Sequence, residues 1–186
     1  MVISYNDWNE LINRSNQVAA KTLSDLLDEP VAMEVEDNDG DWLQPFDSLS
    51  PDSLPETFSS ISLDFFGDIK GSAHLILKEG HDSNLVKVVA EYQEIDLGSM
   101  DDPEVAVLTE IGNMLLNASV GTITNAMGHK VEFKVPVTKF RDGKFGNLAS
   151  KCLSKAEKDC ETLFYKSRLM IGTTGISAML LVLFVN

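Results

Sequence analysis

The chain has 186 residues, of which 44% are hydrophobic, and this content is sufficient for a continuous buried core. Acidic residues outnumber basic ones by 29 to 15, so the formal net charge of −14 would repel a phosphate backbone and a nucleic-acid partner is not expected. The N-terminal sequence MVISYNDWNE lacks the basic start and apolar stretch of a secretory signal. We therefore expect a globular, cytoplasmic protein.

The N-terminal segment predicts an amphipathic helix. At about 100° per residue, its apolar side chains gather on one side and its polar side chains lie opposite them. The apolar set is Trp8, Ile12, Ala19 and Leu26, and the polar set is Glu10, Asn13 and Gln17.

A strand over Val31 to Val35 and a hairpin over Ile61 to Leu77, turning at Gly67-Asp68, are predicted next. The polar stretch Asp37 to Ser60 between them reads as a spacer. Its cluster Asp37-Asn-Asp39-Gly40-Asp41 does not have the spacing of a calcium-binding EF-hand and predicts a solvated loop. A further helix is predicted over His81 to Tyr92, because Leu85, Val88 and Val89 have helical spacing.

The second half of the chain predicts the same kinds of element. A helix over Pro103 to Met127 has an apolar stripe, with Glu110, Asn113 and Asn117 together on the opposite side. A strand over Val131 to Val135, a charged spacer over Lys139 to Lys158 and a C-terminal hairpin are expected after it. The hairpin strands are Phe164 to Ile171 and Ile176 to Val185. The apolar run of the last strand is too short to span a membrane as a helix, which needs about 20 residues, so it predicts a core strand and no membrane anchor.

The two halves are related by a shift of 100 residues, which places Glu10-Leu-Ile-Asn13 on Glu110-Ile-Gly-Asn113. Each copy continues as a helix, a strand, a spacer and a hairpin. The sequence therefore predicts an α+β fold with a pseudo-two-fold repeat, with copies roughly over residues 1–80 and 101–186 of a single domain covering 1–186.

Familiar catalytic and metal-binding patterns are not found in the sequence. His74, His81 and His129 have no spacing typical of a metal site or a catalytic triad, and there is no P-loop. Asparagine is a poor helix former that favours caps and turns, so Asn13 and Asn113 at matching positions inside two helices indicate a use for these amides.

The residues around Asn113 resemble the CheC, CheX and FliY family of chemotaxis phosphatases. The family marker is a Glu, two residues, an Asn, twenty-two residues and a Pro, and Glu110, Asn113 and Pro136 meet this spacing. The presence of two copies looks most like CheC. The chain departs from the family where many members have Asp or Ser four residues before the Glu, because Asn6 and Ala106 stand there. In the first copy, Glu36 stands at the Pro position and Ile12 at the position of Gly112.

The resemblance implies a β-sheet with long helices packed outside it. It also implies a phosphatase acting on the aspartyl phosphate of a CheY-type response regulator, with catalytic residues Glu110 and Asn113 and a matching pair Glu10 and Asn13. Asn113 would place a water in line with the phosphorus, and Glu110 would pair with a lysine of the receiver domain. No metal or cofactor of its own is expected, because the magnesium ion belongs to the receiver.

Two other interpretations stay open at this point. The chain could be a non-catalytic adaptor that binds a response regulator, a CheD-like partner or a flagellar switch component. It could also be an α+β domain unrelated to signalling. The sequence leaves the oligomeric state and the activity of the Glu10 and Asn13 pair undecided.

Overall fold

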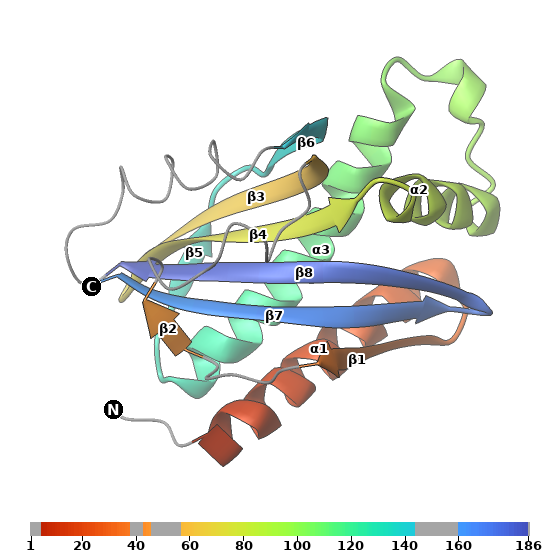
Figure 1. The fold of residues 1–186 in the computed structure, drawn as a ribbon. Coiled ribbons are helices and arrows are strands. Elements are labelled where there is room, and N and C mark those ends of the chain that lie inside the picture. The colour runs from red at the N-terminus through yellow and green to blue at the C-terminus, as the bar shows by residue number, and fades with distance from the viewer. Residues whose placement is uncertain (1–4, 38–42, 46–56, 144–159, 186) are drawn as a thin grey trace.

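A computed structural model describes residues 5–37, 43–45, 57–143 and 160–185. This part of the chain forms three α-helices and an 8-stranded antiparallel sheet (Figure 1). The elements in chain order are α1 (Tyr5–Leu27), β1 (Val31–Asp37), β2 (Leu43–Pro45), β3 (Phe58–Gly67), β4 (Lys70–Lys78), α2 (His81–Tyr92), a short 3₁₀ helix (Leu97–Ser99), α3 (Pro103–Ala126), β5 (Val131–Phe133), β6 (Val137–Gly143), β7 (Cys160–Ile171) and β8 (Thr174–Val185).

The strand order confirms the predicted pseudo-two-fold repeat. The main path through the sheet is β1-β7-β8-β4-β3-β5, with β2 paired to β7 and β6 paired to β3. The repeat relates β1 to β5 and the hairpin β3–β4 to the hairpin β7–β8. Each short strand thus pairs with the hairpin of the other copy, and the two hairpins meet at the centre where β4 pairs with β8.

Helices α1 and α3 lie side by side across one face of the sheet, and α2 packs against α3 and β8 (Figure 1). The sides that the helical periodicity assigns to the core are the sides that pack inward. Trp8, Ile12 and Ala19 of α1 are buried, as are Leu108, Ile111 and Leu115 of α3. The predicted α+β class, with long helices outside a sheet, is therefore confirmed.

One glycine sets how closely α3 approaches the sheet. A Cβ atom at Gly112 would lie 2.6–2.7 Å from three side-chain atoms of Ile61 on β3. Ile61 is fully buried and branched at Cβ, so its side chain has few alternative positions. Only glycine lets the helix backbone come this near to β3.

The predicted bounds of the two spacers and of one strand were wrong. Strand β3 already begins at Phe58, β2 lies within the first predicted spacer, and β6 covers part of the second. Sequence patterning hides β6 because its residues, VTKFRDG, do not alternate regularly between apolar and polar. The strand is only partly buried, and β3 supplies its backbone partners. Strand β5 ends at Phe133 rather than Val135, whose side chain is 86% exposed. Most of the acidic cluster Asp37 to Asp41 lies outside the described residues.

The contact at Gly112 predicts opposite effects for two glycines of α3. Gly112→Ala should lower the free energy of unfolding by about 1–2 kcal/mol, because overpacking against Ile61 outweighs the gain in helix propensity. Gly121→Ala is the matched control: its added Cβ would have no atom within 4 Å beyond the adjoining backbone of its own helix, so stability should rise by up to about 1 kcal/mol. Urea denaturation measures both variants, and equal shifts would contradict the close packing at Gly112.

Candidate functional site

Glu110 and Asn113 lie one turn apart on α3, with Glu110 exposed and Asn113 half-buried. The intervening residues Ile111 and Gly112 are buried and hold this part of the helix on the core. The sequence predicted that Glu110, Asn113 and Asn117 all face away from the core. The structure corrects this for the two amides, because α3 contacts α1, α2, β3, β4, β5 and β6, and its buried side is therefore broad.

A second amide binds Asn113. The Nδ2 of Asn117 donates a hydrogen bond to Oδ1 of Asn113 over 3.0 Å. The Oδ1 of Asn117 is buried and has no hydrogen-bond partner among the described residues. Sequence patterning placed Asn117 on the same side as Asn113, but it gave no indication of this bond.

Strand β6 lies along the same part of α3. The hydroxyl groups of Thr109 and Thr138 are 2.7 Å apart, and Thr109 also donates to the carbonyl of Val105 within the helix. Thr109 directly precedes Glu110 in the chain. The β6 strand, which the sequence did not predict, therefore supports the helix beside the candidate site.

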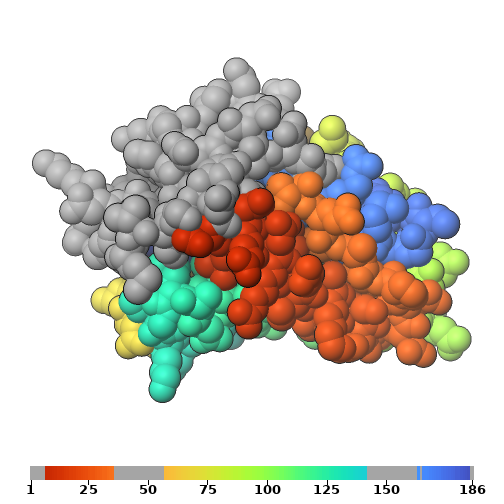
Figure 2. Space-filling model, turned by 90° about the horizontal axis from the view of Figure 1, so that it is seen from below, coloured from red at the N-terminus to blue at the C-terminus, as the bar shows by residue number. Residues whose placement is uncertain are grey.

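The pair on α1 has a different environment. Glu10 and Asn13 are both exposed, and Nδ2 of Asn13 donates to Oδ1 of Asn9 over 3.2 Å. Asn13 and Gln17 line a groove of about 930 Å³ between α1 and β1, and both elements lie open on the face shown in Figure 2. No hydrogen bond within the described residues joins the α1 pair to the α3 pair.

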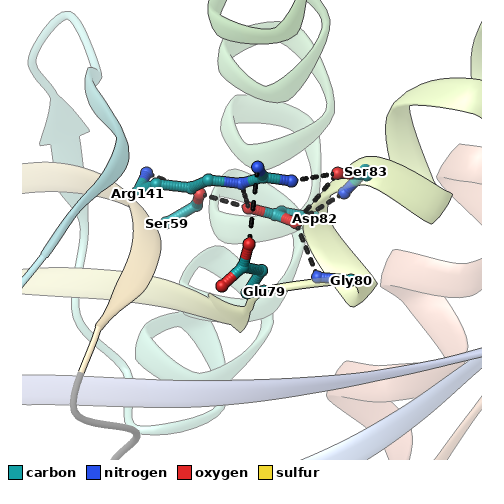
Figure 3. Close-up of polar contacts among 6 residues, drawn as sticks. All are labelled: Ser59, Glu79, Gly80, Asp82, Ser83 and Arg141. Atoms are coloured by element: carbon teal, nitrogen blue, oxygen red, sulfur yellow. Dashed lines mark hydrogen bonds and ion pairs between the residues drawn. The ribbon is translucent and has the colours of Figure 1, made fainter.

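A buried carboxylate joins three segments that are distant in the sequence (Figure 3). Asp82, at the start of α2, is 0% exposed and accepts hydrogen bonds from Ser59 of β3 and from the backbone N–H groups of Gly80 and Ser83. Nε of Arg141 on β6 lies 3.3 Å from Oδ2 of Asp82. We call Ser59, Asp82, Ser83 and Arg141 the Asp82 clasp.

The features of the Asp82 clasp are those of a contact that stabilises the fold, and not those of an exposed reaction centre. Arg141 has a positive φ of 51°, a strained conformation for a residue with a side chain, and its N–H donates to Ser59. Burial alone would raise the pKa of Asp82, but hydrogen bonds from Ser59, Ser83 and Arg141 and the charge of Arg141 together lower it. The clasp fixes the end of β6, and β6 in turn contacts α3.

No group of three or more His, Cys, Asp or Glu side chains comes together in a way that could hold a metal ion within the described part of the chain. The candidate site consists of one carboxylate and neighbouring amides, which can form hydrogen bonds and ion pairs with a partner.

Comparisons with known proteins identify the fold. No family profile matches the chain, and no curated protein matches its sequence. Among solved structures, FliY from Thermotoga maritima matches with a TM-score of 0.67 and 14% identity over 98% of this chain and 91% of that chain. A chain of the CheX–CheY–BeF₃–Mg²⁺ complex from Borrelia burgdorferi matches with a TM-score of 0.52 and 14% identity over 100% of both chains.

Another similar structure is a chain of the FliG–FliM complex from H. pylori, with a TM-score of 0.58 and 10% identity over 96% of this chain and 90% of that chain. These matches show that the chain has a fold of the CheC, CheX and FliY type, as the resemblance implied. None of the described helices combines the length and apolar character needed to cross a bilayer.

The Asp82 clasp predicts a pH-dependent contribution to stability. Because the pKa of Asp82 is lowered in the folded protein, its contribution is complete above the ordinary carboxyl value of 3.8 and is lost as pH falls through the lower folded value. Asp82→Asn should lower the free energy of unfolding by about 2–3 kcal/mol at pH 7. The difference between wild type and variant should shrink below about pH 4.

Glu79→Gln is the matched control for this prediction. Glu79 also lies near Arg141, at 3.5 Å, but its side chain is 68% exposed, so its loss should cost less than about 0.5 kcal/mol. Denaturation at several pH values measures both variants. A difference for Asp82→Asn that stays constant from pH 7 to pH 3 would be inconsistent with a lowered pKa.

Proposed function

We propose that the chain is a protein phosphatase that removes the phosphoryl group from an aspartyl phosphate of a CheY-type receiver domain. The observation that carries the proposal is the placement of Glu110 and Asn113 on one side of a helix that is packed firmly on the sheet. The fold is also shared with a chain of the CheX–CheY–BeF₃–Mg²⁺ complex. A carboxylate and an amide suffice for this reaction if the receiver supplies the magnesium ion and the lysine.

The reaction adds water to phosphorus and releases the aspartate carboxylate. The water oxygen forms the new P–O bond as the bond to the receiver's aspartate breaks, and the water's protons pass to the phosphate product and to solvent. Asn113 positions the water without changing its own charge, because an amide both donates and accepts hydrogen bonds. Positioning alone can remove several kcal/mol, on the order of 7, from a barrier.

Glu110 has a docking role in this proposal. It is exposed one turn before Asn113, where its carboxylate can pair with the lysine of the receiver. The pair would fix how the receiver sits on α3 and thereby where the phosphorus lies relative to Asn113. The pair Glu10 and Asn13 is a second, weaker candidate for the same roles, because both side chains are exposed and α1 has Ile12 at the position of Gly112.

A binding-only role is the second candidate function. Ala106 occupies the position at which many members of the resembled family have Asp or Ser, and the fold is shared with a chain of the FliG–FliM complex. Such an adaptor would bind a receiver or a flagellar switch component without turnover. Binding of a CheD-like partner stays a prediction of the sequence.

The phosphatase proposal predicts that Asn113→Ala lowers kcat by roughly 100-fold, because a misplaced water reacts slowly. Loss of phosphate from a phosphorylated receiver is followed for wild type, Asn113→Ala and Asn13→Ala, with circular dichroism as the check of folding. Asn13→Ala should retain most of the activity. If wild-type protein binds the receiver but does not raise the rate of phosphate loss above the receiver's spontaneous rate, the phosphatase proposal is wrong. The adaptor role would then remain.

The docking role of Glu110 predicts different effects for two substitutions. Glu110→Ala removes an attraction, whereas Glu110→Lys also places like charges against each other, so KM should rise more for Glu110→Lys. Glu91→Lys makes the same charge change at an exposed position on α2 and should alter KM little. Steady-state kinetics at two salt concentrations measure these effects, and equal KM values for the two Glu110 variants would argue against the lysine pair.

A further inference from the structure

The hydrogen bond between Asn117 and Asn113 restricts the amide that the proposed function uses. The χ2 torsion of asparagine is broad and roughly two-fold, so a free side chain presents its oxygen and its nitrogen almost interchangeably. Donation from Nδ2 of Asn117 to Oδ1 of Asn113, over 3.0 Å, removes this ambiguity. One of the two lone pairs of Oδ1 is occupied, and Nδ2 of Asn113 makes no hydrogen bond to another described residue.

The bond is made at a cost to Asn117. Its Oδ1 is buried without a partner among the described residues, although buried polar atoms are nearly always paired. An apolar residue of similar size would avoid this cost, so stability alone does not account for an asparagine at this position. Costs of this kind are typical of sites where the geometry serves function.

The first repeat lacks the same arrangement. Gln17 stands at the position that corresponds to Asn117, and Asn13 instead donates from its Nδ2 to the exposed Asn9. Within the described part of the chain, one N–H of the Asn13 amide is used and both lone pairs of its Oδ1 are left, whereas in Asn113 one lone pair of Oδ1 is used and both N–H groups are left. The two amides at matching positions of the repeat are therefore held through opposite ends, Asn13 through its nitrogen and Asn113 through its oxygen.

We propose that Asn117 is a positioning residue that holds the amide of Asn113 in the orientation needed to place the attacking water. The inference rests on the proposed phosphatase function and deepens it. With Oδ1 held by Asn117, its remaining lone pair accepts from the water while Nδ2 stays available to donate to a phosphoryl oxygen. Loss of Asn117 would leave the chemistry of Asn113 intact but spread its amide over several orientations.

Kinetics together with stability separate this role from a purely structural one. Asn117→Ala should lower kcat by about tenfold with KM unchanged, because docking through Glu110 is retained. Its midpoint of thermal unfolding should stay equal or rise, since the unpaired Oδ1 is removed. Asn125→Ala makes the same deletion at an exposed position of α3, so it should leave kcat unchanged and measure the stability gained from helix propensity alone.

The direction of the hydrogen bond is tested by Asn117→Asp, which keeps the side-chain shape but offers only acceptors at neutral pH. The carboxylate would accept from Nδ2 of Asn113 and reverse its amide, so kcat should fall at least as far as in Asn117→Ala. Wild-type kcat in Asn117→Asp would overturn the assigned role. A lowered melting midpoint together with a raised KM in Asn117→Ala would also overturn it and indicate a structural role.

A readout independent of turnover separates this inference from the proposed function. In ¹⁵N-labelled protein, the side-chain amide of Asn113, assigned by its loss in Asn113→Ala, should be ordered in wild type and mobile in Asn117→Ala. Equal order in both proteins would overturn the positioning role even if wild type is an active phosphatase. Inactive wild-type protein would overturn the proposed function and the catalytic use of Asn117, while the NMR result would still decide whether Asn117 holds the amide.

Discussion

The close contact between α3 and β3 at Gly112 determines where the candidate site lies. Gly112 touches the fully buried Ile61, and Asn113 is the next residue in the chain. A site that positions a reacting water needs its groups held within about 0.5 Å. The helix backbone can meet this requirement because β3 belongs to a hairpin at the centre of the sheet, and packed interiors deform little. The packing of the core therefore fixes the backbone position of Asn113.

The repeat gives α1 and α3 equivalent places in the fold but unequal surroundings. Ile12 of α1 corresponds to Gly112, so the first helix lacks the glycine contact, and Glu36 corresponds to Pro136. Asn13 is exposed beside a groove, whereas Asn113 is half-buried and bound by Asn117. The same sequence pattern therefore gives Asn113 an amide of restricted orientation and gives Asn13 an amide bound only to an exposed neighbour. This difference favours α3 as the site of any chemistry.

Sequence periodicity predicted the helices, the hairpins and the repeat, because these depend on residues close together in the chain. The turn glycines and the apolar, β-rich runs in β3, β4, β7 and β8 were sufficient to predict the two hairpins. Strand β6 was missed because its pairing with β3 is not a local property. The Asp82 clasp was missed for the same reason, since Asp82 and Arg141 are 59 residues apart. The sequence did single out Asn113 and Asn117. Their partial burial and their hydrogen bond could not be predicted, because these depend on how many elements surround α3.

The clasp and the glycine contact together restrain two different motions of α3. Contact with Ile61 limits how near the helix lies to the sheet, but a helix on a sheet can also roll about its own axis. A side-chain amide lies about 6 Å from the axis, so a roll of about 10° moves it by about 1 Å. Displacements of that size cost on the order of 100-fold in rate. The contact between Thr109 and Thr138 opposes such a roll, and Arg141 fastens β6 to the buried Asp82. The strained backbone of Arg141 is thus connected through one strand to the orientation of Asn113.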